Sequence, residues 1–391
     1  MSPPRVVFVD FLAAVAAGQL TRARAFMRRV YEIDADSHFV ILRERGTLED
    51  VVKPGPRTTV IDVALSQGPF KGVRRILWES RYVAGLIARH RADVYLTFSH
   101  FLPRGVRTAV RIVGVSNLAP FSQEAIEADA FPGRLRLHLL RWLIVNSVRR
   151  ATHVIALSVA CKDSLVGAGV DPERILVLTN GCDDFVEALA LPDAAVQGQV
   201  APPPYVLCVS HFYAYKNFEV LLDGFARLAP HLRERHTLVL VGAPIDRKYF
   251  ERVSARSASL AERCRIVILP GVPYTDLPAL YRNASAFVFT SLVENSPNAL
   301  LEAMSAGLPM AVVDREPMPE FAGDAALYFA PHSSNELAAA MSRLLEDGEL
   351  RQRLSERARM RSARYRWDVL VRGTVAAYNP AVNEPGRTTA I

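Results

Sequence analysis

Short apolar runs alternate with amphipathic stretches of helical length along most of the chain. The runs are rich in aliphatic and aromatic residues and read as buried strands. In the first half they span 5–9, 38–42, 59–63, 94–98, 111–115, 153–156 and 175–178, and in the second half 205–209, 237–241, 265–269, 286–290, 310–313 and 327–329. Helical periods such as 21–33 and 74–89 separate most of them. Strands separated by helices imply right-handed βαβ units, so we predict an α/β protein with two doubly wound, Rossmann-like parallel-sheet domains.

A change of composition divides the chain near its middle. Residues 184–204 hold a stretch of small residues that ends in three prolines, directly before the run at 205–209. We therefore predict an N-terminal domain over 1–184 and a C-terminal domain over 200–365, with a helix near 366–378 that packs back on the first. Residues 379–391 lack periodicity and read as a disordered tail.

The sequence SLVENSPNALLEAMSAGLP has the signals of a helix that follows a buried strand. Ser296 is a suitable N-cap, and Pro297 suits the first helical position. Gly307, with a proline two residues later, predicts the end of the helix. Glu294 then lies in the loop between strand and helix, and Glu302 lies about two turns inside the helix.

The predicted start of this helix offers a place for a diphosphate. The backbone N–H groups of Asn298, Ala299 and Leu300 lie at its positive end, where unpaired donors favour an anion. Glu294 and Glu302 could accept hydrogen bonds from sugar hydroxyls but would repel bare phosphate. An anion site flanked by two carboxylates indicates a nucleotide sugar as the ligand. In the alternative interpretation, one glutamate stabilises the helix start and the other is solvated.

Two further loops follow strands of the second predicted sheet. Lys216 comes after the run at 205–209 and just before a helix, where a cation could meet the same diphosphate. Gly271 and Val272 follow the run at 265–269, and their backbone groups could face a nucleotide base. A solvated lysine and an ordinary turn are the alternatives. We favour the diphosphate for Lys216, because ligands of open parallel sheets bind at the carboxyl ends of the strands.

Composition excludes several other classes of protein. Half of the 391 residues are apolar and 22% are charged, which is typical of a globular chain. The four cysteines are widely spaced and form no metal-binding pattern, so we expect reduced, buried thiols and no metal site. The N-terminal apolar run is short and soon followed by arginines, which favours a buried strand over a signal peptide. No window is apolar enough to span a membrane.

The excess positive charge lies in the first half of the chain. Through Asp184 there are 25 basic and 18 acidic residues, against 22 of each from Phe185 onward. Between 134 and 150, arginines alternate with leucines and Trp142 without any acidic residue. This segment reads either as a helix that binds an anionic membrane surface or as a core-packing helix with a solvated basic face. Nucleic acid is disfavoured, because no binding motif accompanies the charge.

The order of several segments along the chain resembles that in the retaining glycosyltransferases of family four. The resemblance rests on the lysine loop, on the E-x7-E segment with LLEAMSAGLP, on the later PMPEFAGDAALYFAP, and on RRATHVIALSVACKDSLVGAGVDPERILVLTNGCD at the end of the first half. It covers 149–378 well and 1–148 loosely. It implies a GT-B fold of two Rossmann-like domains and transfer of a hexose without a metal or other cofactor.

The resemblance also implies a role for each candidate site residue. Glu294 would bind hydroxyls of the donor sugar, and Glu302 would bind hydroxyls of the ribose. Lys216 would bind the diphosphate and stabilise it as the leaving group. The amides that follow Pro297 would share that task, in the donor-binding segment that also contains Ser296.

The sequence departs from the family pattern at three places. The family usually has an arginine five residues before the lysine, where this chain has His211, a donor whose charge depends on pH. The glycine-rich first loop of the family is reduced to Gly18. Family members often carry a histidine where this chain has Ser116 followed by Asn117, and we predict that Asn117 bonds the donor sugar.

We therefore expect a retaining glycosyltransferase that acts in surface polysaccharide synthesis. It would move a hexose from a nucleotide-diphosphate sugar, such as GDP-mannose or a UDP-hexose, to a glycan or lipid-linked acceptor. We expect it in the cytoplasm, bound peripherally to the inner face of the plasma membrane. A nucleotide-sugar epimerase on the same fold and a non-catalytic nucleotide-sugar-binding subunit are the alternatives.

Overall fold

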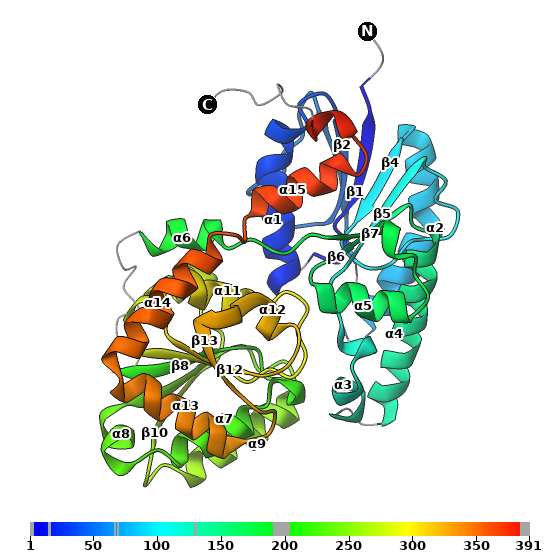
Figure 1. The fold of residues 1–391 in the computed structure, drawn as a ribbon. Coiled ribbons are helices and arrows are strands. Elements are labelled where there is room, and N and C mark those ends of the chain that lie inside the picture. The colour runs from blue at the N-terminus through cyan, green and yellow to red at the C-terminus, as the bar shows by residue number, and fades with distance from the viewer. Residues whose placement is uncertain are drawn as a thin grey trace. The chain divides into compact units, whose positions relative to one another are not determined.

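The computed structural model describes residues 4–14, 17–65, 68, 70–128, 131–190 and 204–383. The chain forms two units, each built on its own parallel sheet (Figure 1). The first unit comprises Met1–Phe121, Arg136–Asn180 and Trp367–Ile391, and the second comprises Ser122–Leu135 and Gly181–Arg366, each in its described part. The last α-helix of the chain therefore belongs to the first unit.

The sheet of the first unit has seven parallel strands in the order β3-β2-β1-β4-β5-β6-β7. Its strands are β1 (Val6–Asp10), β2 (His38–Glu44), β3 (Thr58–Val63), β4 (Val94–Thr97), β5 (Val110–Val115), β6 (His153–Ala156) and β7 (Ile175–Val177). Strands β2 and β3 follow on one side of β1, and strands β4 to β7 follow in order on its other side. The strand order therefore reverses between β1 and β4, which places helices on both faces of the sheet.

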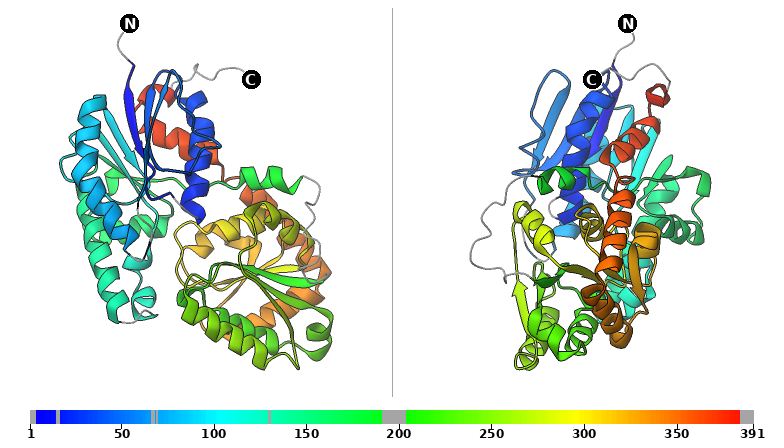
Figure 2. Two further views of the ribbon diagram at one scale, coloured as in Figure 1. Left: turned by 180° about the vertical axis from the view of Figure 1, so that it is seen from behind. Right: turned by 60° about the vertical axis from the view of Figure 1, so that its left-hand side comes forward.

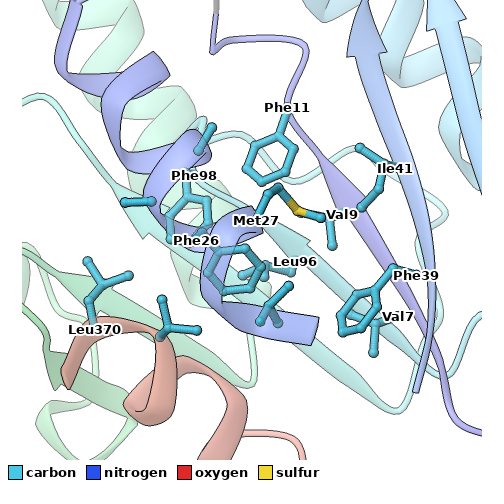
Figure 3. Packing of buried hydrophobic residues seen from close by; sticks show 14 of the residues in the cluster. Val7, Val9, Phe11, Phe26, Met27, Phe39, Ile41, Leu96, Phe98 and Leu370 are labelled. Carbon is cyan, nitrogen blue, oxygen red and sulfur yellow. The ribbon is translucent and has the colours of Figure 1, made fainter. Parts of the chain in front are cut away.

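Helices cover both faces of this sheet (Figures 1 and 2). They are α1 (Ala17–Ile33), α2 (Lys71–His90), α4 (Phe131–Arg150), α5 (Val159–Gly167) and α15 (Trp367–Ala376). On one face α1 and α15 pack around residues that include Phe26, Phe98 and Leu370, as Figure 3 shows. On the other face α2, α4 and α5 pack around residues that include Val83 and Ile144. The strands are buried on both sides, which explains their nearly continuous apolar runs.

The sheet of the second unit has six parallel strands in the order β10-β9-β8-β11-β12-β13. Its strands are β8 (Tyr205–Val209), β9 (Thr237–Val241), β10 (Arg265–Leu269), β11 (Ala286–Phe289), β12 (Met310–Val313) and β13 (Ala326–Phe329). The α-helices grouped with it are α3 (Gln123–Ala128), α6 (Asp183–Leu189), α7 (Phe218–Ala226), α8 (Pro230–Arg235), α9 (Arg247–Ser259), α10 (Leu277–Asn283), α11 (Asn298–Ser305), α12 (Met318–Ala322), α13 (Ser334–Glu346) and α14 (Gly348–Ser362). Here the strand order reverses between β8 and β11.

All thirteen predicted strands are present, and none differs from its predicted bounds by more than two residues at either end. The predicted α/β class with two doubly wound parallel sheets is confirmed.

Three predictions about segments outside the sheets need correction. Helix α1 begins at Ala17, so Gly18 lies in its first turn and not in a loop. Part of the stretch 184–204, where the composition changes, forms helix α6, while residues 191–203 lie outside the described residues. In the predicted tail, Pro380–Asn383 form a 3₁₀ helix, and residues 384–391 lie outside the described residues.

The four cysteines are all buried free thiols. Burial raises the pKa of the Cys182 and Cys208 thiols to about 12, so neither is a thiolate nucleophile at neutral pH. Within the ranges given above, none of the helices combines the length and the apolar character that crossing a bilayer requires.

Candidate active site

Most of the predicted site residues lie at the point where the second sheet reverses its strand order. Strands β8 and β11 are parallel neighbours, and the connections that leave them run in opposite directions. Open parallel sheets bind ligands in the crevice outside such a pair of carboxyl ends. His211 and Lys216 follow β8, and Glu294 follows β11. The topology therefore brings three predicted residues to one place.

Hydrogen bonds join the two loops directly. The N–H of Leu292 donates to the carbonyl of Tyr215 at 2.8 Å. The hydroxyl of Thr290 donates to the carbonyl of Lys216 at 2.7 Å. Backbone groups of one loop are thus held by residues of the other, which fixes the side chains that both loops carry.

Lys216 and Glu294 form an ion pair at this edge of the sheet. The Lys216 Nζ lies 2.5 Å from the Glu294 Oε1. The two side chains are only 13% and 15% exposed, so water screens the pair less than it would on the open surface. The lysine is predicted to bind the diphosphate and the glutamate to bind the sugar, and in the structure the two side chains are in contact.

His211 is held in one tautomer by the neighbouring loop. Its Nδ1 accepts the backbone N–H of Ala243 at 3.1 Å, which requires the ring proton to lie on Nε2. Burial, with a smaller contribution from Lys216, lowers the pKa of His211, while Glu294 acts in the opposite direction. The ring is therefore neutral near pH 7 and donates only through Nε2.

Gly242 allows the loops after β8 and β9 to lie against one another. A Cβ at this position would be 1.9 Å from the carbonyl oxygen of Ser210, a distance that no side chain can occupy. The N–H of Phe212 also donates to the carbonyl of Ala243 at 3.0 Å. The position of His211 thus depends on a residue without a side chain, for which the sequence carries no motif.

The helix after Glu294 begins one residue later than predicted. Pro297 is the N-cap of α11 and Asn298 is its first residue, while Ser296 remains in the loop. The N–H groups of Leu300 and Leu301 both donate to the carbonyl of Pro297, at 3.0 Å. Leu300 is therefore not an available donor, and the predicted anion site at the helix start loses one of its three amides.

The predicted end of α11 is confirmed. Gly307 has a φ of 69°, and its N–H donates to the carbonyl of Met304. The N–H of Leu308 donates to the carbonyl of Ala303, which completes a Schellman motif.

Glu302 lies about one turn inside α11 rather than two, and it is buried. Its Oε1 accepts the hydroxyl of Tyr274 at 2.9 Å, and its Oε2 accepts the hydroxyl of Tyr281 at 3.0 Å. Burial raises the pKa of Glu302, and the two tyrosine hydroxyls oppose that shift. A ribose that reaches Glu302 must share this carboxylate with the tyrosines or displace one of them.

The two tyrosines differ in accessibility. Tyr274 is half exposed, in the loop that contains Gly271 and Val272 after β10, whereas Tyr281 is buried beside Phe185. Gly271 has a φ of 79°, as the turn of this loop requires. Tyr274 is therefore the partner of Glu302 that a ligand can displace.

Two predicted residues, Gly18 and Asn117, belong to the first unit. The Asn117 Oδ1 accepts the N–H of Ala119 at 2.9 Å and closes a local turn. The preceding Ser116 donates its hydroxyl to the carbonyl of Phe98 at 2.7 Å. Gly18 is helical, as described above. In the part of the chain that the structure describes, no three or more His, Cys, Asp or Glu side chains are grouped to hold a metal.

Comparisons with known proteins identify the family of the chain. Residues 193–361 match the family model of glycosyl transferases group 1, and residues 18–184 match that of glycosyltransferase family 4. The chain is 29% identical over 46% of its length to the O-antigen chain mannosyltransferase B of Escherichia coli, of which the match covers 47%. It is 28% identical over 80% of its length to the D-inositol 3-phosphate glycosyltransferase of Actinosynnema mirum, of which 81% is covered.

Among solved structures, HepE of Anabaena in complex with UDP and glucose superposes with a TM-score of 0.71 at 17% identity, covering 95% of this chain and 98% of that one. At this identity the likeness shows the fold. The two family models together span both units, and the topology is that of the GT-B glycosyltransferases. The chain belongs to glycosyltransferase family 4.

Proposed function

We propose that this protein is a retaining hexosyltransferase that uses a nucleoside-diphosphate sugar. The observation that carries the proposal is the Lys216–Glu294 pair, formed where β8 and β11 end and in the loop that leads into α11. A cation, a carboxylate and the start of a helix at one edge of the sheet match a ligand that combines diphosphate with sugar hydroxyls. Membership of glycosyltransferase family 4 supports the same reaction.

In the proposed reaction the bond between the anomeric carbon and the diphosphate oxygen breaks, and its electron pair leaves with the diphosphate. The acceptor hydroxyl oxygen forms the new bond on the same face of the sugar, and its proton passes to the departing phosphate. Negative charge grows on the diphosphate, so Lys216 and the positive end of α11 stabilise the transition state more than the ground state.

The remaining residues would bind and orient the donor. Glu294 would accept hydroxyls of the sugar while it holds Lys216. Glu302 would accept hydroxyls of the ribose, and Gly271 and Val272 would offer backbone groups to the base. His211 would donate its Nε2 proton to a phosphate oxygen without adding charge.

Known relatives narrow the choice of substrate. One is a mannosyltransferase of O-antigen chains, and one structural neighbour binds UDP and glucose. We propose GDP-mannose or a UDP-hexose as donor and a glycan or lipid-linked acceptor of surface polysaccharide synthesis.

Incubation of the protein with a panel of GDP- and UDP-sugars and a chelator tests this function. We expect one donor to be consumed by transfer or slow hydrolysis, with the sugar released in its original anomeric configuration. An epimerised nucleotide sugar would instead identify an epimerase. Binding of a nucleoside diphosphate without turnover of any donor, with extracts of lipid-linked glycans as acceptors, would identify a binding subunit. Either result overturns the proposal.

We also propose that the first unit docks on an anionic membrane. Helices α2 and α4 cover the same face of its sheet and together carry ten arginines and lysines and a single acid, Glu79, which is buried. Leu77 on α2 and Leu139 and Trp142 on α4 are each more than half exposed. Exposed apolar side chains among basic ones match the interface of a bilayer with anionic headgroups.

Sedimentation with lipid vesicles measures this docking. We expect binding to vesicles that contain phosphatidylglycerol, weaker binding at high salt, and none to purely zwitterionic vesicles. Changing Leu139 and Trp142 together to glutamine should lower the partition coefficient at least about tenfold, because their apolar surface is no longer buried in the interface. Met360→Gln, an exposed apolar residue of α14, is the matched control. Equal binding by the double variant and the control would contradict this proposal.

A further inference from the structure

The first unit buries an arginine that no predicted role accounts for. Arg22, in the second turn of α1, is only 3% exposed. Its Nε donates to the Oδ1 of Asn180 at 2.8 Å, and its Nη1 donates to the hydroxyl of Ser116 at 2.9 Å. The guanidinium also lies 5.8 Å from the ring centroid of Phe98. An amide, a hydroxyl and an aromatic ring thus fix its position.

All of these partners are neutral. Among the residues that the structure describes, Arg22 pairs with no carboxylate. Burial lowers its pKa to about 10, so the side chain remains charged near pH 7. Removing an ion from water without a counter-ion is strongly unfavourable, which is why buried charges are usually paired. Arg22 is therefore a buried cation whose counter-ion is not supplied by the described protein.

The guanidinium also has more N–H donors than these two hydrogen bonds use. It carries five N–H donors, and only Nε and Nη1 donate to described residues. Ser116 and Asn180 hold one edge of the group and leave Nη2 for another partner. The planar guanidinium with its parallel N–H donors fits two oxygens of a phosphate or a carboxylate.

The location is one where this class of fold binds ligands. Phe98 follows β4, Ser116 follows β5, Asn180 lies just after β7, and α1 follows β1. Arg22 thus lies at the carboxyl edge of the first sheet, beside the reversal of strand order between β1 and β4. Ser116 also stands where family members often have a histidine, so the hydroxyl that replaces that ring holds a cation instead.

We propose that Arg22 forms an anion-binding site of the first unit, separate from Lys216, that takes a phosphate or carboxylate group of a substrate. Ser116 and Asn180 are its positioning residues, because they orient the guanidinium and touch no ligand themselves. A phosphate or carboxylate of an acidic acceptor has the chemistry that this site recognises. A nucleoside diphosphate has the same chemistry, so the experiment distinguishes the two sources.

Titration with inorganic phosphate in a Lys216→Met background tests the site, because that change removes the only charged group among the phosphate contacts proposed in the second unit. Thermal unfolding of the full chain at constant ionic strength gives the readout, since a ligand of the folded state raises the unfolding temperature. We expect phosphate to stabilise Lys216→Met. Adding Arg22→Gln should weaken phosphate binding roughly 10- to 100-fold, the ratio that one charge-assisted hydrogen bond supplies.

Two further variants keep the test informative if Arg22→Gln folds poorly. Ser116→Ala keeps the charge but frees the guanidinium, so we expect a smaller loss of phosphate affinity. Arg24→Gln, which removes an exposed arginine of the same helix paired with Asp50, should leave that affinity unchanged. No stabilisation of Lys216→Met by phosphate, or the same stabilisation after Arg22→Gln or Ser116→Ala, would overturn the proposal.

The affinity for UDP or GDP, measured with Lys216 intact, then identifies the source of the anion. A loss of this affinity in Arg22→Gln assigns the site to the donor diphosphate. An unchanged affinity, with phosphate binding lost, assigns it to an acidic acceptor. Both results support an anion site at Arg22.

Discussion

Replacing Glu294 with glutamine is expected to lower the rate constant of sugar transfer about 10²- to 10³-fold. The carboxylate holds Lys216 at 2.5 Å in a largely buried setting and, in the proposed function, binds the sugar that becomes positively charged. Glutamine keeps the shape but removes the charge that fixes the lysine and favours an oxocarbenium-like sugar. A loss of this size is typical when one preorganised electrostatic group is removed from an active site. Steady-state kinetics with the donor identified by the panel measures it.

A double-mutant cycle shows whether Glu294 acts through Lys216. If the two form one unit, Lys216→Met combined with Glu294→Gln should be no slower than the slower single variant. Glu251→Gln, which alters an exposed surface pair with Arg247, is the matched control and should retain wild-type activity. Activity of Glu294→Gln within about threefold of wild type would contradict the proposed role, since that corresponds to less than 1 kcal/mol of transition-state stabilisation.

The fold was predictable because both sheets are parallel and buried on two sides. Each strand then appears as a continuous apolar run, and the helices between the runs have their own period. The same topology explains why Lys216 and Glu294 could be found. Both follow strands, and loops that leave the carboxyl ends of neighbouring strands lie together wherever the strand order reverses.

Contacts that depend on packing between distant segments could not be predicted. Tyr274 and Tyr281 meet Glu302 because their loop and helix lie against α11, and no spacing in the sequence encodes that contact. The same is true of Arg22, which approaches Asn180 across 158 positions of the chain. At the helix start, the sequence predicted Ser296 as the N-cap and Pro297 as the first helical residue. The two hydrogen bonds to the Pro297 carbonyl show that Pro297 is the cap.

Gly242→Ala is expected to destabilise the second unit by about 3 kcal/mol, the upper part of the range for overpacking. The new Cβ would meet the carbonyl oxygen of Ser210 at 1.9 Å and its carbonyl carbon at 2.5 Å. Neither contact can be relieved by rotating a side chain, because both atoms belong to the backbone. The loops after β8 and β9 must separate, and His211 then loses the N–H of Ala243. Activity should therefore fall together with stability.

The probe of unfolding matters for this variant. Trp78, Trp142 and Trp367 are the three tryptophans of the chain, and all lie in the first unit, so their fluorescence does not report the second unit directly. Circular dichroism detects both units, and hydrogen exchange of the Ser210 amide, which donates to the Val241 carbonyl, reports the affected strands. Gly348→Ala is the matched control, because its Cβ would meet only the end of Arg351 at 3.6 Å, an ordinary contact. We expect it to change stability by no more than about 0.5 kcal/mol. A Gly242→Ala protein as stable as Gly348→Ala, with unchanged exchange at Ser210, would mean that the two loops can separate without cost, and the fixed position of His211 would then need another cause.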